Sequence, residues 1–366
     1  MKQDSEELRG LVNHLSAVLQ KENFGPNRGK TERPDPPHHS SPSRSGRTGQ
    51  DSSAQASDAW IWKDWQIHPV NGGLNGRLFR ASGPAGDVAT KFMVRDERDR
   101  AVREWAALTT LAENASTLAP QPLLLDRDRY PQQVIVQSWL EGESSDAVPA
   151  NDAAWEALCQ HLLDIHSLPM GPGHPAIRPV VLSVTSAADA LRAISFQHNC
   201  LPGTKWSQAV NDLVDQAKLL SWPSWPRPPL RFCRGDPNIR NFIRRPGSWA
   251  SVDWEYSVWG DPAFEIADFL VHAAHISWPL RQTSRLVDLY CAHSKDTAIR
   301  ERIAVYETLM LIWWTLRLGR LLPEARSGAD KRLVQRPQSW FEERLKLQER
   351  YLQLAVDALE ARKTAL

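Results

Sequence analysis

Net charge is the first property that this sequence almost lacks. Its 366 residues include 44 lysines and arginines against 43 aspartates and glutamates, which leaves a net charge of +1. Such a balance provides no strong field toward a polyanion, an anionic membrane or a cationic ligand. Because the basic residues form no patch beyond scattered arginines near the N-terminus, nucleic-acid binding is the least favoured class of function.

Cysteines and long apolar runs are also scarce. The longest apolar run, residues 309–316, is too short to cross a bilayer. Residues 1–15 carry early acids and no apolar core, so neither a signal peptide nor a transit peptide is expected. The cysteines form no CxxC pair, which indicates reduced thiols and argues against a disulfide framework or a zinc site: Cys159, Cys200, Cys233 and Cys291. These features predict a soluble cytoplasmic protein without a membrane partner.

The N-terminal part divides into a helix and a linker. Apolar residues recur at three- and four-residue spacing between Leu8 and Leu19, so residues 1–24 are predicted to contain an amphipathic helix. This helix could dock on the body, join two copies in a homodimer or bind another protein. Residues 25–58 contain no aliphatic side chain larger than alanine and no aromatic ring, which predicts a disordered linker. The GPNRGKT segment inside the linker is no phosphate loop, because it has too few residues between its glycines and no strand before it.

From Ala59 onward the pattern changes to strands. A hairpin with the turn NGGLNG at 71–76 leads to a strand that carries Lys91, and a charged helix and two further strands follow. After Asn151 the pattern is mostly helical, apart from short strands around Asp236, with later helices expected from about residues 262, 281, 298 and 336. We therefore predict an α+β protein with a strand-rich domain at 59–140 and a larger helical domain at 141–366.

Three polar side chains near the ends of the predicted short strands suggest a metal site. Asp236 and Asn241 lie in the segment RFCRGDPNIRNFI, and Asp253 lies in SVDWEYSVWGDPAFEIADF. Their hard oxygen atoms suit Mg²⁺, which takes few protein ligands and keeps its waters or substrate phosphates. A purely structural interpretation leaves this group without a purpose.

The order of these segments resembles the aminoglycoside phosphotransferase and choline kinase family. GDPNIRN matches that family's catalytic loop, and VDWE followed by GDPAFEIAD matches its metal-binding segment, within a resemblance that covers roughly residues 60–320. The resemblance implies a two-lobed protein-kinase-like fold, with a nucleotide-binding N-lobe and a catalytic, substrate-binding C-lobe. It also implies Mg²⁺-dependent transfer of the terminal phosphate of ATP or GTP to a hydroxyl of a small molecule.

The resemblance also implies roles for individual residues. Asp236 would accept or orient the proton of the substrate hydroxyl, while Asn241 and Asp253 would hold Mg²⁺. Lys91 would pair with the nucleotide phosphates, and Glu104 would be its ion-pair partner. The remaining nucleotide contacts would come from the glycine turn and from the segment after the last N-lobe strand: Gly72, Gly73, Gly76, Ser138 and Leu140.

Several alternatives remain open. The glycine turn also fits a plain hairpin, Lys91 a solvated lysine, and Asp261 a helix cap before Pro262. Arg234 stands where the family has histidine, so a kinase-like pseudoenzyme that binds nucleotide and acts as a regulatory protein is the second hypothesis. Arg234 would either weaken Asp236 as a base or hold the loop by hydrogen bonds. The acceptor could be an amino alcohol, a sugar, an amino acid, a macrolide or an aminoglycoside.

Overall fold

The computed structural model describes most of the chain beyond the N-terminal part. The described residues are 9–11, 13–14, 17, 60–62, 64–70, 76–84, 86–114, 117–169, 182–200, 206–329 and 336–365. The predicted linker at 25–58, with its GPNRGKT segment, and the turn residues 71–75 lie outside this set. Gly72 and Gly73 are among the turn residues, so their predicted role receives no structural description.

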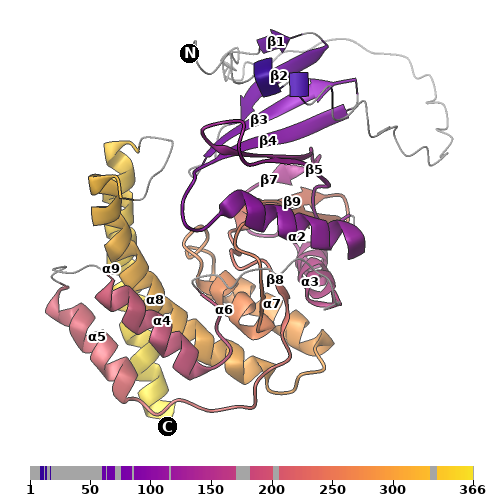
Figure 1. Ribbon diagram of the computed structural model, residues 1–366. Helices are drawn as coiled ribbons and strands as arrows, with labels where there is room; N and C mark the ends of the chain where they lie inside the picture. Colours follow the sequence, from indigo (N-terminus) through magenta and orange to yellow (C-terminus); the bar gives the residue numbers. More distant parts are fainter. Residues whose placement is uncertain are drawn as a thin grey trace, which may run out of the picture.

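An antiparallel sheet forms the strand-rich part at the top of Figure 1. Its strands follow the order β1-β2-β3-β4-β6-β5. Their bounds are β1 Trp60–Trp62, β2 Trp65–Val70, β3 Gly76–Gly83, β4 Gly86–Met93, β5 Pro122–Asp126 and β6 Gln133–Ser138. Helix α2, Arg100–Asn114, lies between this sheet and the helical part (Figure 1).

Side-chain alternation gives the sheet two different faces. One face packs Val88 and Phe92 of β4 with Val134 and Val136 of β6 into a core of their own. On the other face, Lys91 pairs in register with Ile135, which packs with α2 and the helical part. The register therefore directs Lys91 toward the junction between the two parts of the molecule.

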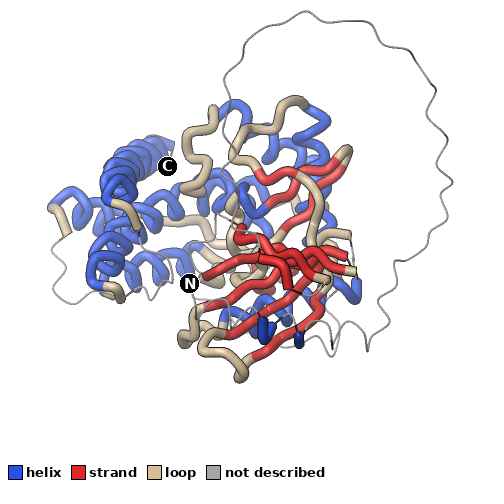
Figure 2. The backbone as a smooth tube through the Cα atoms, turned by 90° about the horizontal axis from the view of Figure 1, so that it is seen from above, coloured by secondary structure: helices blue, strands red, loops and turns tan. Residues whose placement is uncertain are grey.

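The larger part consists mainly of helices around one extensive core, and α8 and α9 run side by side in Figure 1. The helices are α3 Asp152–His166, α4 Ala187–Asn199, α5 Gln208–Leu219, α6 Pro262–Val271, α7 Leu280–His293, α8 Ile299–Ser327 and α9 Gln338–Ala365. Two small sheets have the strand orders β10-β9-β7 and β11-β8, and both contact α3. Their strands are β7 Glu143–Ser144, β8 Arg231–Cys233, β9 Phe242–Arg245, β10 Ser248–Ser251 and β11 Val258–Gly260. A single 3₁₀ turn, η1 Ile239–Asn241, precedes β9. Figure 2 shows the strands gathered on one side and the long helices on the other.

The chain crosses from one part to the other through a short connection after β6. The amide of Trp139 donates to the carbonyl oxygen of Asp87 at 2.9 Å, which ties the start of the connection to the N-terminal sheet. Its far end is β7, which pairs with β9. Between them, a Cβ atom at Gly142 would lie 2.5 Å from Ile243 Cγ2, so the connection packs closely against β9.

These observations confirm the predicted mixed fold with a strand-rich part and a helical part. Asp261 caps α6 by accepting from the amide of Ala263, with Pro262 in the first turn, as the alternative reading of that motif expected. The described residues of the predicted N-terminal helix are helical, and Leu11 is buried against Trp65 and Phe92. Among the described residues, no helix is both long and apolar enough to cross a membrane.

Candidate active site

A buried carboxylate of α6 holds the loop that carries Asp236 through hydrogen bonds to its backbone. Glu265 of α6 accepts hydrogen bonds from the amides of Arg234 at 2.7 Å and Gly235 at 3.2 Å through Oε1. Its other oxygen lies 2.6 Å from Nε2 of His166. Because both oxygens of Glu265 are engaged, the cluster it forms with His166 and Cys233 braces the loop and leaves little ligand capacity for a metal ion. The loop can therefore present Asp236 in one fixed orientation.

Arg234 braces the same loop from inside the protein. Its side chain is fully buried between two aromatic rings, with Cζ 4.7 Å from the ring centroid of Phe242 and 4.6 Å from that of Trp254. Nη2 donates to the carbonyl oxygens of Val252 at 2.9 Å and Asp236 at 3.4 Å. These hydrogen bonds agree with the loop-holding role considered for this arginine, and its charge also lowers the pKa of Asp236, which is the other effect considered.

The carboxylate of Asp236 is hydrogen-bonded on both oxygens. Oδ1 accepts from the amide of Asn238 at 3.2 Å and lies 3.3 Å from Nε2 of His272. Oδ2 accepts from Nδ2 of Asn241 at 3.4 Å. Burial alone would raise the pKa of Asp236, but the His272 hydrogen bond and the charge of Arg234 outweigh it and lower the pKa below its ordinary value. Asp236 is therefore ionised at neutral pH and able to accept a hydrogen bond from a hydroxyl.

Asn241 and Asp253 come together through the hairpin of β9 and β10. Phe242 pairs with Ser251 in the register, and the amide of Val252 donates to the carbonyl oxygen of Asn241 at 2.8 Å. Since Nδ2 of Asn241 faces Asp236, its amide oxygen is left for another partner. That oxygen and the Asp253 carboxylate are the hard ligands that Mg²⁺ prefers, so this pair fits the predicted metal.

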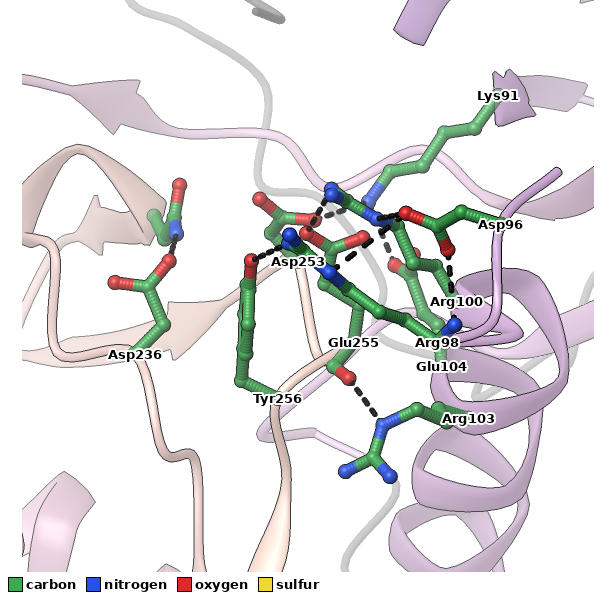
Figure 3. Close-up of polar contacts among 11 residues, drawn as sticks. Lys91, Asp96, Arg98, Arg100, Arg103, Glu104, Asp236, Asp253, Glu255 and Tyr256 are labelled. Carbon is green, nitrogen blue, oxygen red and sulfur yellow. Dashed lines mark hydrogen bonds and ion pairs between the residues drawn. The ribbon is translucent and has the colours of Figure 1, made fainter. Parts of the chain in front are cut away.

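Lys91 joins the sheet to this hairpin. Its Nζ lies 2.6 Å from Oε1 of Glu104 on α2 and 3.4 Å from Oδ1 of Asp253, and Figure 3 shows the three side chains pointing toward one another. Burial would lower the pKa of Lys91, but the neighbouring carboxylates of Glu104 and Asp253 raise it. The lysine therefore remains a cation and could pair with a phosphate group.

Two arginines tie α2 to the segment that follows Asp253 (Figure 3). Nη1 of Arg100 donates to Oε1 of Glu255 at 3.0 Å. Nε of Arg103 donates to the carbonyl oxygen of Glu255 at 2.8 Å, and its Nη2 donates to that of Ser257 at 3.1 Å. Burial and the nearby Asp253 charge raise the pKa of Glu255 to about 8 despite Arg100. Through these contacts, α2 and the Asp253 segment form one unit.

The remaining predicted nucleotide contacts that the structure describes lie at the ends of two strands or just beyond. The amide of Ser138 donates to the carbonyl oxygen of Gln121, and its hydroxyl accepts from the Gln121 amide, both at 2.9 Å. Leu140, two residues on, follows β6 in the connection. Gly76 begins β3, where a Cβ atom would lie 2.3 Å from the carbonyl oxygen of Phe92. Close strand packing therefore explains this glycine without a ligand.

Some residues that build the site carried no recognisable signal in the sequence. Arg100 and Arg103 resemble other charges on a polar helix until the fold places them beside Glu255. Gln137 pairs with Ala89, on the same face as Lys91, and is 2% exposed. Its Oε1 has no hydrogen-bond partner among the described residues, and only the register of β4 and β6 could have singled it out.

Comparisons with known proteins agree with this geometry. The model of the phosphotransferase enzyme family (APH) matches residues 66–306. A choline/ethanolamine kinase family protein from Mesorhizobium loti is 19% identical, covers 81% of this chain and 91% of its own, and superposes with a TM-score of 0.53. No match was found among curated protein sequences.

Two other solved structures show the same fold. The GDP complex of an aminoglycoside 2'-phosphotransferase is 15% identical, covers 78% of this chain and 92% of its own, and has a TM-score of 0.55. A macrolide 2'-phosphotransferase from Brachybacterium faecium is 17% identical, covers 72% of this chain and 89% of its own, and has a TM-score of 0.53. The resemblance stated from the motifs is thereby confirmed at the level of family and fold.

Proposed function

The chain belongs to the phosphotransferase enzyme family, and from this premise we propose that it transfers the terminal phosphate of ATP or GTP to a hydroxyl of a small molecule. One observation carries the proposal. An ionised Asp236 lies beside Asn241, and Lys91 from the N-terminal sheet lies beside Asp253. A protein that only bound partners would not need this combination of a base, hard metal ligands and a phosphate-pairing cation.

The residues have complementary roles in the proposed reaction. Oδ1 of Asp236 has two partners, Asn238 and His272, whereas Oδ2 accepts only from Asn241, so the acceptor hydroxyl would donate to the remaining lone pair of Oδ2. As the acceptor oxygen bonds to the terminal phosphorus, the bond to the bridging oxygen breaks and nucleoside diphosphate leaves; the hydroxyl proton passes to Asp236 and then to solvent.

The charge of the phosphates would be balanced from both lobes. Asn241 and Asp253 would hold Mg²⁺, which neutralises phosphate charge when bound. Lys91, held by Glu104, would pair with phosphate oxygens from the opposite side.

The base would lie between the sheet and the connection after β6. The amides of Ser138 and Trp139 are already engaged, so the Ser138 carbonyl oxygen and the Leu140 amide are the groups proposed to bond the base. The backbone of the turn at 71–76 is proposed to cover the phosphates. Gln137, on the Lys91 face, could bond either an amino group or a carbonyl of the base, because a carboxamide both donates and accepts.

The organisation proposed for the chain follows the same division. Residues 59–140 would form the nucleotide-binding lobe, and residues 141–366 the catalytic and substrate-binding lobe, after an N-terminal helix and a linker at 25–58. The buried Leu11 favours docking of that helix on the N-lobe over pairing with a second copy. The reduced thiols support a cytoplasmic location.

The direct test is turnover with candidate acceptors. Purified protein would be given Mg²⁺, ATP or GTP, and pools of amino alcohols, sugars, amino acids, macrolides or aminoglycosides, with nucleotide consumption as the measurement. We expect one pool to stimulate turnover and Asp236→Asn to lower kcat by about 10²-fold or more. Asp288→Asn is the matched control, because Asp288 is an exposed partner of Arg300 far along the chain on α7.

Two other outcomes would change the proposal. If no pool stimulates turnover while Mg-nucleotide still raises the Tm, the nucleotide-binding pseudoenzyme becomes the better hypothesis. If Asp236→Asn and Asp288→Asn lose activity equally, Asp236 is not the catalytic carboxylate.

A further inference from the structure

A histidine from a different element lies against the carboxylate of Asp236. His272 follows the last residue of α6 as its C-terminal cap, and its Nε2 lies 3.3 Å from Oδ1 of Asp236. Both side chains are largely buried, with exposed fractions of 10% and 22%. At this burial the contact persists only if one atom donates to the other, since two facing lone pairs would repel.

The second ring nitrogen settles which atom donates. The amide of Ala274 donates to Nδ1 of His272 at 3.2 Å, so Nδ1 must carry a lone pair. A neutral imidazole has one protonated nitrogen, and the proton is therefore on Nε2. His272 thus donates Nε2–H to Asp236, and the amide of Ala274, just after α6, sets this tautomer.

Packing holds the ring in this position. Trp314 of α8 meets the His272 ring edge-on at a centroid distance of 5.0 Å, and His275 stacks on it at 5.6 Å. Trp314 is itself fixed, because its Nε1 donates to Oδ1 of Asp268 at 3.0 Å and its ring stacks on Tyr351. Rotation of the imidazole away from Asp236 would therefore disturb α6, α8 and α9 together.

We propose that His272 is a positioning residue for phosphoryl transfer, which fixes Oδ1 of Asp236 through Nε2–H so that Oδ2 faces the acceptor hydroxyl. The proposal rests on the function proposed above. With Oδ1 occupied by Asn238 and His272, the carboxylate cannot rotate to exchange its two oxygens without breaking both bonds. His272 acts only through Asp236 and does not touch the reacting atoms.

The kinetic test compares two substitutions at the same site. His272→Ala removes the donor, whereas His272→Gln places an amide N–H near the position of Nε2. With the stimulating acceptor, we expect His272→Ala to lower kcat by about 10- to 100-fold, as misplacement of a reacting group does, and to leave the KM for Mg-nucleotide unchanged. His272→Gln should recover most of the loss. His293→Ala, on the exposed side of α7, is the control.

A double substitution separates positioning from a general structural role. If His272 acts through Asp236, adding His272→Ala to Asp236→Asn should cause no further loss of kcat. Additive losses, or a His272→Gln variant as impaired as His272→Ala, would overturn the proposal.

A spectroscopic measurement tests the same contact without any turnover. In wild-type protein with ¹⁵N-labelled histidine, His272 is assigned from the signal missing in His272→Gln. We expect the proton on Nε2 and a shift of that resonance in Asp236→Asn. A proton on Nδ1, or an Nε2 resonance indifferent to Asp236→Asn, would refute the contact. Absence of acceptor-stimulated turnover in wild type, by contrast, would count against the proposed function alone.

Discussion

Two glycines share a left-handed backbone but differ in their surroundings. Gly235, next to Asp236, has a φ of 69°, and Gly328, after α8, has a φ of 72°. A Cβ atom at Gly235 would lie 2.2 Å from the carbonyl oxygen of Tyr256, whereas one at Gly328 would meet nothing within 4 Å. The backbone penalty is common to both positions, so comparing them isolates the close approach of Tyr256.

Alanine substitutions at these positions should therefore differ in cost. We expect Gly328→Ala to lower the free energy of unfolding by about 1 kcal/mol, the penalty of the left-handed backbone alone. Gly235→Ala should cost at least about 2 kcal/mol and also reduce activity, because the clash displaces the loop of Asp236. Urea titration measures both values. Equal losses would mean that Tyr256 moves away freely.

A buried acid beside the aromatic cluster should make stability depend on pH. Burial raises the pKa of Asp268 from 3.8 to about 6, although the hydrogen bond from Trp314 opposes the shift. The folded state therefore binds more protons than the unfolded state between these values. Its contribution to stability is complete below pH 3.8 and is lost as the pH rises through 6.

Asp268→Asn removes this titration and keeps an acceptor for Trp314. Relative to wild type, we expect the variant to gain about 2–3 kcal/mol of unfolding free energy between pH 4 and pH 7. Denaturant titration at a series of pH values measures the difference, and Asp288→Asn provides an exposed control. If the difference in unfolding free energy between Asp268→Asn and wild type did not change with pH, the pKa of Asp268 would not be raised in the folded protein.

The residues that could be predicted from the sequence belong to local motifs. Asp236, Asn241 and Asp253 lie within two short segments, and the family resemblance suggested Glu104 as the partner of Lys91. The structure brings Asp236 together with Asn241, and Lys91 with Glu104 and Asp253. His272 belongs to neither motif, and its contact with Asp236 depends on where α6 ends.

At the scale of the element, the position of α2 decides whether Lys91 has its partner. The helix carries Glu104, and it is fastened to the segment after Asp253 through Arg100 and Arg103. Buried hydrogen bonds from a charged group contribute about 1.5–3 kcal/mol each. Loss of the hydrogen bonds of either arginine should therefore make the position of Glu104 less fixed without unfolding α2.

Arg103→Gln tests this fastening. We expect the KM for Mg-nucleotide to rise by about 5- to 10-fold. Without the Arg103 hydrogen bond, α2 holds Glu104 less firmly, so Lys91 is positioned less well to pair with the phosphates. The matched control is Arg98→Gln. Arg98 is more exposed than Arg103, and it meets the segment after Asp253 through the hydroxyl of Tyr256 at 3.4 Å. A KM unchanged in both variants would show that α2 stays in place without Arg103.

Elements with strong periodicity were predictable, and the shortest ones were not. Helices expected from about 262, 281, 298 and 336 begin at Pro262, Leu280, Ile299 and Gln338. Strands β7 and β11 have two and three residues, so a period of two has no room to appear in them. They form because β9 and β8 offer hydrogen-bonding edges nearby.

At the scale of the whole molecule, the N-terminal helix extends the small lobe. Leu11 is 2% exposed and packs with Trp65, Phe92 and Tyr130. Leu11→Ala should lower the unfolding free energy by about 2 kcal/mol, at the lower end for a buried leucine. Thermal unfolding measures the change against Ala17→Ser, an exposed site on the same helix. If Leu11→Ala behaves like Ala17→Ser, the helix is off the sheet in solution.

The connection after β6 limits how the two parts of the molecule can move relative to each other. Trp139 is tied to the sheet, the carbonyl oxygen of Glu141 accepts from Nε of Arg245 at 3.1 Å, and Gly142 is packed against β9, so rotation would centre on the backbone of Leu140. Because Arg100 and Arg103 bind α2 to the segment after Asp253, the N-terminal sheet would turn about an axis through this short segment while α2 stays with the helical part. A base bonded to the Leu140 amide would bind on that axis, where displacement is smallest. Its affinity would then stay nearly constant as the phosphates, farther from the axis, swing into line with the acceptor.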